Sequence, residues 1–232
     1  MIIDTIPFYV TGVFSLTIVF ALYMFYLATL RNKMILIVTL IWLLLQSAIS
    51  ISGFYLYEKG MPPRFAMLVM PPLVTVIVMF ATGKGRRLID TFDLKHLTYL
   101  QAFRLPVELV LYWLHLASFI PVLMTFEGRN FDILAGFSAP VIGYLFFNRK
   151  SIGRRSLLLW NVICLLLLIN IVANAVLSAP TVFQKFAFDM PNTGVLYFPF
   201  VWLPGYLVPL ALLSHLVSIR QLMRGNTQSS QT

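Results

Sequence analysis

Three titratable side chains share one helical face of an apolar segment near the middle of the chain. Arg104, Glu108 and His115 are spaced 4 and 7 residues apart, which places them within about 40° of one another on a helix. A carboxyl group and an imidazole on one face can pass protons or contact a polar solute. We therefore expect a proton path or a ligand site around these side chains.

The depth of each group decides how strongly it points to function. A helix that begins near Leu105 puts Glu108 in the first turn, where the helix dipole favours an acid, and leaves Arg104 to pair with it at the membrane interface. His115 would lie about 13 Å deep, near the middle of a hydrocarbon core about 30 Å thick. An imidazole bonded to a neighbouring helix explains His115 most simply, and proton transfer, substrate contact or metal ligation are the alternatives.

Two further groups of polar residues are candidates. The first crowds the connection after this segment and consists of Glu127, Arg129, Asn130 and Asp132. These residues form either a polar gate at the outer mouth or an ion pair with a cap for the next helix, made by Asn130 or Asp132. Asn170 and Asn174 share a face of a later apolar segment, where they line a ligand or proton path or bond to neighbouring helices.

The composition is that of an integral membrane protein. Of 232 residues, 59% are hydrophobic and 11% are charged, whereas soluble domains carry about 25% charged residues. The net charge of +9 would suggest nucleic acid in a soluble chain, but in a membrane protein its distribution matters more, and we expect no nucleic-acid partner. The single cysteine, Cys164, excludes a disulfide framework and a cysteine-based metal site.

Runs of about 20 apolar residues that end at charged positions predict an all-α membrane fold with seven transmembrane helices. They form one polytopic domain over 1–232, with a short polar tail at 220–232. The expected spans are 6–30, 34–57, 65–82, 105–124, 132–147, 156–178 and 197–219. The fifth span carries Gly136, Ala139 and Gly143, a small-residue face that predicts close contact with a neighbouring helix.

The connections place most of the positive charge on one side of the predicted bundle. Twelve Lys and Arg residues fall in connections on one side and four on the other, so the preference of basic loops for the inside predicts an outer N-terminus and a cytoplasmic C-terminus. We expect a plasma membrane of the bacterial inner-membrane type, with anionic lipid headgroups against the basic face.

Two long connections have patterns of their own. Residues 83–103 place Leu88, Phe92, Tyr99 and Phe103 on an apolar stripe opposite charged residues. This stripe predicts an amphipathic helix in the inner interface between the third and fourth spans. The outer connection before the last span is rich in Phe and Tyr, which is typical of an interfacial aromatic belt, and a lid over an outward-facing cavity is the alternative.

No motif identifies a reaction or a cofactor. The chain lacks the HExxH, GxSxG and CxxC patterns, and we assign no catalytic or metal-binding residue. No Lys falls inside an expected span, which excludes a retinal Schiff base. A bis-histidine haem would need two histidines at matched depth, which nothing in the spacing guarantees.

Three functions are consistent with these observations. Interior polar groups and prolines within spans favour a small permease-like transporter with a polar path near His115. A faint similarity between the first three and the last three spans fits either an internal repeat, as in some transporters, or chance. The first alternative is an intramembrane enzyme that acts on a lipid or prenyl substrate, with Glu108 and His115 as acid and base. The second is a scaffold or accessory subunit whose polar groups only hold helices together.

Overall fold

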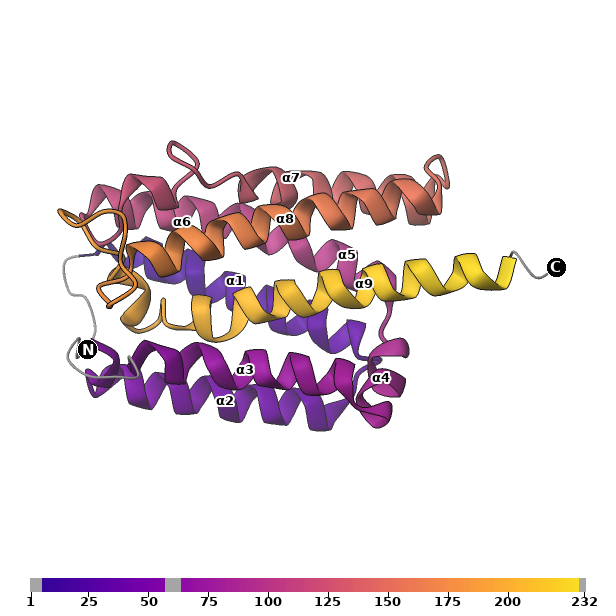
Figure 1. Ribbon diagram of the computed structural model, residues 1–232, viewed down its shortest axis with the longest axis horizontal. Coiled ribbons are helices and arrows are strands. Elements are labelled where there is room, and N and C mark those ends of the chain that lie inside the picture. Colours follow the sequence, from indigo (N-terminus) through magenta and orange to yellow (C-terminus); the bar gives the residue numbers. More distant parts are fainter. Residues whose placement is uncertain (1–5, 57–63, 230–232) are drawn as a thin grey trace.

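The computed structural model describes residues 6–56 and 64–229, and every regular element within these ranges is helical. Long helices lie side by side along one direction (Figure 1). Five of them are long and apolar enough to cross a membrane: α1 (Phe8–Ala28), α2 (Lys33–Ile51), α3 (Arg64–Ala81), α8 (Arg154–Ser178) and α9 (Val208–Ser229) with the π-helical turn before it (Leu203–Leu207). The all-helical expectation is confirmed for this part of the chain, and its apolar helices are consistent with a lipid bilayer. Two ends of predicted elements lie outside the described residues: residue 57, which ends the second span, and residues 230–232, which end the tail.

The helical stretch that corresponds to the expected fourth span, residues 94–116, begins earlier than predicted, and we call it the fourth pass after that expectation. The single interfacial helix expected over 83–103 is divided, and its second part joins the span expected over 105–124. The elements are α4 (Gly83–Asp90), α5 (Leu94–Leu100), a 3₁₀-helical turn (Gln101–Phe103) and α6 (Arg104–Leu116). The break lies at Asp93, whose side chain accepts a hydrogen bond from the His96 N–H and so starts α5. Only α4 turns across the end of the bundle (Figure 1).

Residues 94–116 form one continuous pass that runs antiparallel to α1. The Asp93 N–H donates to the last carbonyl of α1 (2.8 Å), and at the opposite end the Tyr9 and Trp113 rings meet with their centroids 5.2 Å apart. Apolar side chains of this pass, α1 and α9 form the main core. Arg104 therefore lies near the middle of the pass, about 15 Å from its start.

The helix α6 ends at Leu116, before the predicted end of the fourth span. The backbone of Ser118 is left-handed (φ 63°), and the Phe119 N–H donates to the Leu114 carbonyl (3.0 Å), which closes the helix. Pro121 then follows without an N–H to continue the helical hydrogen bonds. Apolar residues beyond Leu116 therefore belong to a connection rather than to a membrane helix.

The connection 117–131 folds back into the bundle before the next helix begins. That helix is α7 (Asp132–Gly143), continued by a π-helical turn (Tyr144–Asn148). It starts level with Arg104 on the neighbouring pass, whose guanidinium is 3.5 Å from the Asp132 carboxylate. In Figure 1 α7 extends from the middle of the bundle to the end where α4 lies.

A small-residue face holds α7 against the fourth pass, as predicted. The backbone of Gly136 lies so close to α6 that a Cβ would be 2.4 Å from the Leu105 nitrogen. A Cβ on Gly143 would be 2.9 Å from the Tyr99 ring, and Ala139 between the two glycines is fully buried. The close approach of these helices therefore requires small residues at these positions.

We expect Gly136→Ala to destabilise the protein by about 1–3 kcal/mol, because the added methyl group must push α7 away from the backbone of α6. Thermal unfolding in detergent should give a lower Tm than that of the wild type. Gly12→Ala on α1 is the matched control, because a Cβ there meets nothing within 4 Å, and its Tm should be unchanged or higher. Equal Tm values for the two variants would contradict the close contact.

One end of the bundle gathers the basic connections. The turn after α1, α4, the turn between α7 and α8, and the last part of α9 lie there (Figure 1). Asp90 on α4 accepts hydrogen bonds from Arg220 (2.8 and 3.2 Å) and from Arg224, and Arg154 donates to two carbonyls of α9. The first residues of the polar tail expected at 220–232 are therefore a docked part of α9 instead.

The Asp90 contact should make stability depend on pH. The Arg220 guanidinium, which donates hydrogen bonds to Asp90, holds the pKa of that carboxyl below its ordinary value. A carboxyl with a lowered folded-state pKa stabilises the fold above its unfolded-state pKa, and this contribution is lost as the pH falls through the folded-state pKa. Acidification from about pH 7 to about pH 3 should therefore lower the Tm of the wild type more than that of Asp90→Asn.

The effect should be small, about 1 kcal/mol or less, because the Asp90 side chain is partly exposed and solvent screens the pair. Asp189→Asn is the control, because Asp189 is an exposed carboxylate in the connection between α8 and α9. Its acid response should match that of the wild type. A response of Asp90→Asn equal to that of the wild type would contradict the proposed linkage.

Candidate functional site

A buried charged cluster occupies the middle of the bundle. Arg104 Nε lies 3.5 Å from Asp132 Oδ2, and the two side chains are only 2% and 8% exposed. This distance is that of an ion pair, but the two atoms do not form a hydrogen bond, and Arg104 Nη1 donates to the Cys164 carbonyl on α8 instead (3.4 Å). Because a buried charge is costly without a partner, Arg104 and Asp132 depend on each other.

Asn130 joins Glu108 to the same cluster. Its Nδ2 donates to Glu108 Oε1 (2.5 Å) and to the Met124 carbonyl (3.1 Å), while its Oδ1 accepts from the Asp132 N–H (3.1 Å). One amide therefore holds the connection 117–131 inside the bundle and bonds the first turn of α7. The N-cap position of α7 is Phe131, which makes no side-chain cap bond, so the expected cap by Asn130 is replaced by a bond that the N–H of the first helical residue donates to Asn130 Oδ1.

A cavity of about 70 Å³ lies beside this cluster. Three of the buried side chains that line it carry an oxygen without a hydrogen-bond partner: Glu108 Oε2, Asp132 Oδ1 and Asn192 Oδ1. Asn192 belongs to the connection between α8 and α9, so this connection forms one wall of the cavity. Buried acceptors are normally hydrogen-bonded, and a cavity of this size admits water or a small polar group. The cavity therefore presents acceptors to a hydrogen-bond donor.

The cluster draws its residues from two separate predicted groups. Arg104 and Glu108, which we expected to pair with each other at the membrane interface, contact Asp132 and Asn130 instead. The other carboxylate of the outer group, Glu127, is exposed and forms no ion pair within the described residues. The expected outer cluster is therefore split between the interior and the surface.

The remaining predicted residues do not line this cavity. His115 lies in the last turn of α6, with its Nδ1 3.0 Å from the Ile120 carbonyl. Asn170 donates to the carbonyl of the exposed Arg129 (2.7 Å), and Asn174 donates to the Asn170 carbonyl (3.0 Å). Each of these side chains has a local partner that explains its presence.

The contacts that sequence reasoning missed include a buried pair between α8 and α9, and it also missed a residue of the cavity wall. His215 Nδ1 on α9 is 3.0 Å from Asn161 Oδ1 on α8, and both side chains are buried. No local pattern signals this contact, because it depends on how α8 and α9 face each other. Asn192 lies in a connection without periodicity, so nothing around it in the sequence indicates that it points inwards.

The charged cluster is suited to binding a hydrogen-bond donor. Across residues 6–56 and 64–229, no three His, Cys, Asp or Glu side chains come together to hold a metal ion. The carboxylates of Glu108 and Asp132 accept hydrogen bonds from a neutral donor or a cation, and bonds to a charged partner are the stronger.

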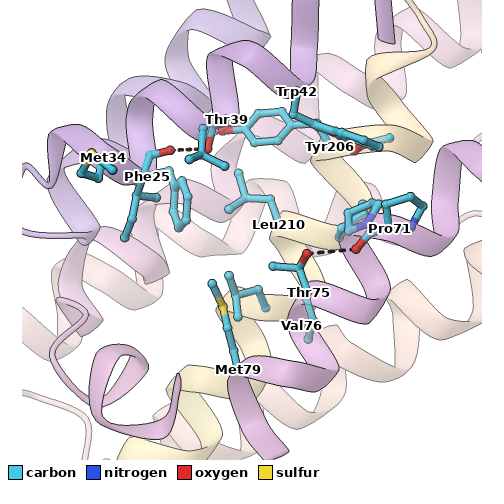
Figure 2. Close-up of a pocket in the computed structure, with 16 residues that line it drawn as sticks. Phe25, Met34, Thr39, Trp42, Pro71, Thr75, Val76, Met79, Tyr206 and Leu210 are labelled. Atoms are coloured by element: carbon cyan, nitrogen blue, oxygen red, sulfur yellow. Dashed lines mark hydrogen bonds between the residues drawn. The ribbon is translucent and has the colours of Figure 1, made fainter. Parts of the chain in front are cut away.

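A larger, apolar pocket of about 350 Å³ lies between α1, α2, α3 and α9 (Figure 2). Both threonines in its wall donate to carbonyls of their own helices, and Trp42 Nε1 donates to the Gly205 carbonyl (2.8 Å). Pro209 has no N–H to offer this carbonyl, so Trp42 satisfies a group that α9 leaves free. The buried hydroxyl of Tyr206 has no partner. This pocket is suited to an apolar chain rather than to a polar solute.

The region matched by a protein-family model takes in the whole charged cluster and its cavity. No curated protein and no solved structure matches the chain. The family model covers residues 61–223, which are most of the chain. The protein with this buried cluster therefore belongs to the family described as a domain of unknown function (DUF8737).

Proposed function

We propose that this protein is a small permease-like membrane transporter whose substrate site is the cavity beside Glu108 and Asp132. One observation carries the proposal: three unpaired oxygens line a cavity in the interior of the bundle, beside a buried ion pair. Ionisable groups at membrane depth are costly, and they commonly mark substrate or ion pathways. Helices that only need to pack are often as stable with apolar residues in place of a buried ion pair.

The same proposal includes seven membrane passes. Five long apolar helices, the continuous stretch over 94–116 and the shorter helix Asp132–Asn148, completed by the folded-back connection 117–131, support this number. The basic connections lie at one end of the bundle, so we place this end and the C-terminus in the cytoplasm and the N-terminus outside. The membrane would be a bacterial-type plasma membrane, with anionic headgroups against the basic end.

Cysteine labelling from each side of the membrane tests the transporter. Ala175 lines the cavity, whereas Ala139 is fully buried against neighbouring helices. We expect Ala175→Cys to react with a membrane-impermeant maleimide at least about tenfold faster than Ala139→Cys, because a cavity with alternating access opens to water. Wild-type protein, whose Cys164 is buried, sets the background.

Reaction of Ala175→Cys at the background rate in both intact cells and inverted vesicles would overturn the transporter proposal and leave the scaffold. The same reagent tests orientation through two exposed residues, Ser151 and Lys185. Ser151→Cys should react only from the cytoplasmic side and Lys185→Cys only from the outside. The opposite pattern would overturn the proposed orientation.

The enzyme alternative, with Glu108 and His115 as acid and base, has less support. The two residues are seven positions apart on α6, which separates them by about 10 Å along the helix axis. An acid and a base that serve one reaction step must each come within about 3 Å of the reacting atoms. The position of His115 at the end of α6, bonded to the Ile120 carbonyl, therefore favours a structural role for this imidazole.

A further inference from the structure

A second hollow adjoins the polar cavity from the outer surface of the bundle. An apolar groove of about 460 Å³ lies between α3, α8 and α9, and all its lining side chains are aliphatic or proline. Val172 on α8 and Val208 on α9 line both this groove and the polar cavity. Ile169 and Val176, which also line the groove, are 53% and 38% exposed. The groove therefore opens sideways, towards the acyl chains of a bilayer, and shares a wall with the cavity.

When both carboxyls are ionised, the charged cluster carries one negative charge that Arg104 does not balance. Arg104 compensates one of the two carboxylates, Glu108 and Asp132, and no other Lys or Arg of the described residues forms an ion pair with either. His215 is bonded to Asn161 and does not line the cavity. One positive charge in the cavity would therefore neutralise the cluster, which lowers the cost of burying it.

The number of unpaired oxygens in the cavity equals the number of N–H donors of a primary ammonium group. Glu108 Oε2, Asp132 Oδ1 and Asn192 Oδ1 are three acceptors without donors, and a primary ammonium has three N–H donors and one positive charge. Hydrogen bonds between such a cation and carboxylates are stronger than those between neutral groups. A quaternary ammonium has the same charge but no N–H, so it would leave these oxygens unpaired.

We propose that the protein binds an amphipathic long-chain primary amine, with its ammonium group in the polar cavity and its chain in the groove between α3 and α8. The ligand enters from the bilayer past Val172 and Val208 rather than from water. The ammonium donates to Glu108 Oε2, Asp132 Oδ1 and Asn192 Oδ1, while Arg104 stays beside Asp132 Oδ2. As a statement about the transported substrate, this proposal rests on the transporter function proposed above.

Equilibrium binding of radiolabelled dodecylamine to the full chain in phosphatidylcholine nanodiscs tests this site. We expect saturable binding that unlabelled dodecylamine displaces. Equal concentrations of three other compounds should displace the bound dodecylamine far less. 1-Dodecanol lacks the positive charge, dodecyltrimethylammonium lacks the N–H donors, and ethylamine lacks the long chain.

Two variants of the cavity and two matched controls locate the ligand. Glu108→Gln keeps an acceptor for Asn130 but removes the charge, and Asn192→Leu removes one acceptor, so each should weaken dodecylamine binding at least about tenfold. Glu127→Gln makes the same change on an exposed turn, and Tyr206→Phe removes the unpaired hydroxyl of the other pocket. Both controls should bind dodecylamine as the wild type does, and Tm values show that each variant is folded.

Each part of the proposal can fail separately. Displacement by 1-dodecanol or dodecyltrimethylammonium as strong as that by dodecylamine would overturn the ammonium site, and equal displacement by ethylamine would overturn the role of the groove. Unchanged affinity in Glu108→Gln and Asn192→Leu would overturn the position of the ligand. No dodecylamine binding together with a reactive Ala175→Cys would overturn only the ligand class. Binding without that reactivity would overturn only the transporter.

Discussion

Replacement of Arg104 by methionine should destabilise the protein by about 3–5 kcal/mol, the largest effect of a single substitution that we expect. Methionine fills part of the space but carries no charge, so the carboxylates of Glu108 and Asp132 would remain buried without a cation. A buried charge that loses its partner retains the full cost of its removal from water. Thermal unfolding of the purified protein in detergent, together with the yield of folded protein, measures this loss.

The double variant Arg104→Met/Asp132→Leu is the control for this prediction. It removes both members of the ion pair and leaves Glu108 as a single carboxylate. Most of the lost stability should return, because apolar replacement of a buried ion pair is often close to neutral. Arg155→Met changes an exposed arginine on α8 and should have little effect. A wild-type Tm for Arg104→Met would show that the pair does not stabilise the bundle.

Asn130→Asp should cost about 3 kcal/mol, because it removes the amide that donates to Glu108 and to the Met124 carbonyl. The new carboxylate has no N–H to donate and adds a further negative charge beside Glu108. The connection 117–131 should then leave the interior more readily. A lower Tm and faster cleavage by trypsin after Arg129 are the expected results.

The control for Asn130→Asp is the same change at Asn148. This residue is exposed and accepts a hydrogen bond from the Tyr99 hydroxyl through Oδ1, an interaction that a carboxylate can also make. Asn148→Asp should therefore keep the wild-type Tm and cleavage rate. If the two variants behave alike, Asn130 does not anchor the connection.

Local patterns predicted most helices but misplaced the fourth pass. The apolar stripe opposite charged residues made residues 83–103 look interfacial, and the apolar residues after Leu116 looked like the end of a membrane helix. In the structure Gln101 is fully buried in the fourth pass, while the left-handed residue Ser118 ends α6. A hydropathy scale assigns each residue a value that depends only on its type. It therefore does not account for the burial of a polar side chain by neighbouring helices.

The residues of the candidate site were largely identified, but their arrangement was not. Arg104, Glu108, Asn130 and Asp132 were singled out because charged and polar groups are costly near a bilayer. Their expected partners were neighbours in the sequence, whereas the actual contacts join α6 to the start of α7. The shift of the fourth pass also moved Arg104 to its middle and His115 to its end.

The sequence by itself determined an all-helical apolar chain, the small-residue face of α7 and the gathering of basic residues in a few connections, because each of these follows from composition and local periodicity. Only the tertiary structure decided that Arg104 lies beside Asp132, that Asn130 binds Glu108 and that Asn192 faces the cavity. These contacts join residues from different segments. They depend on how the helices face one another and on where a connection folds back, and no local pattern contains that information.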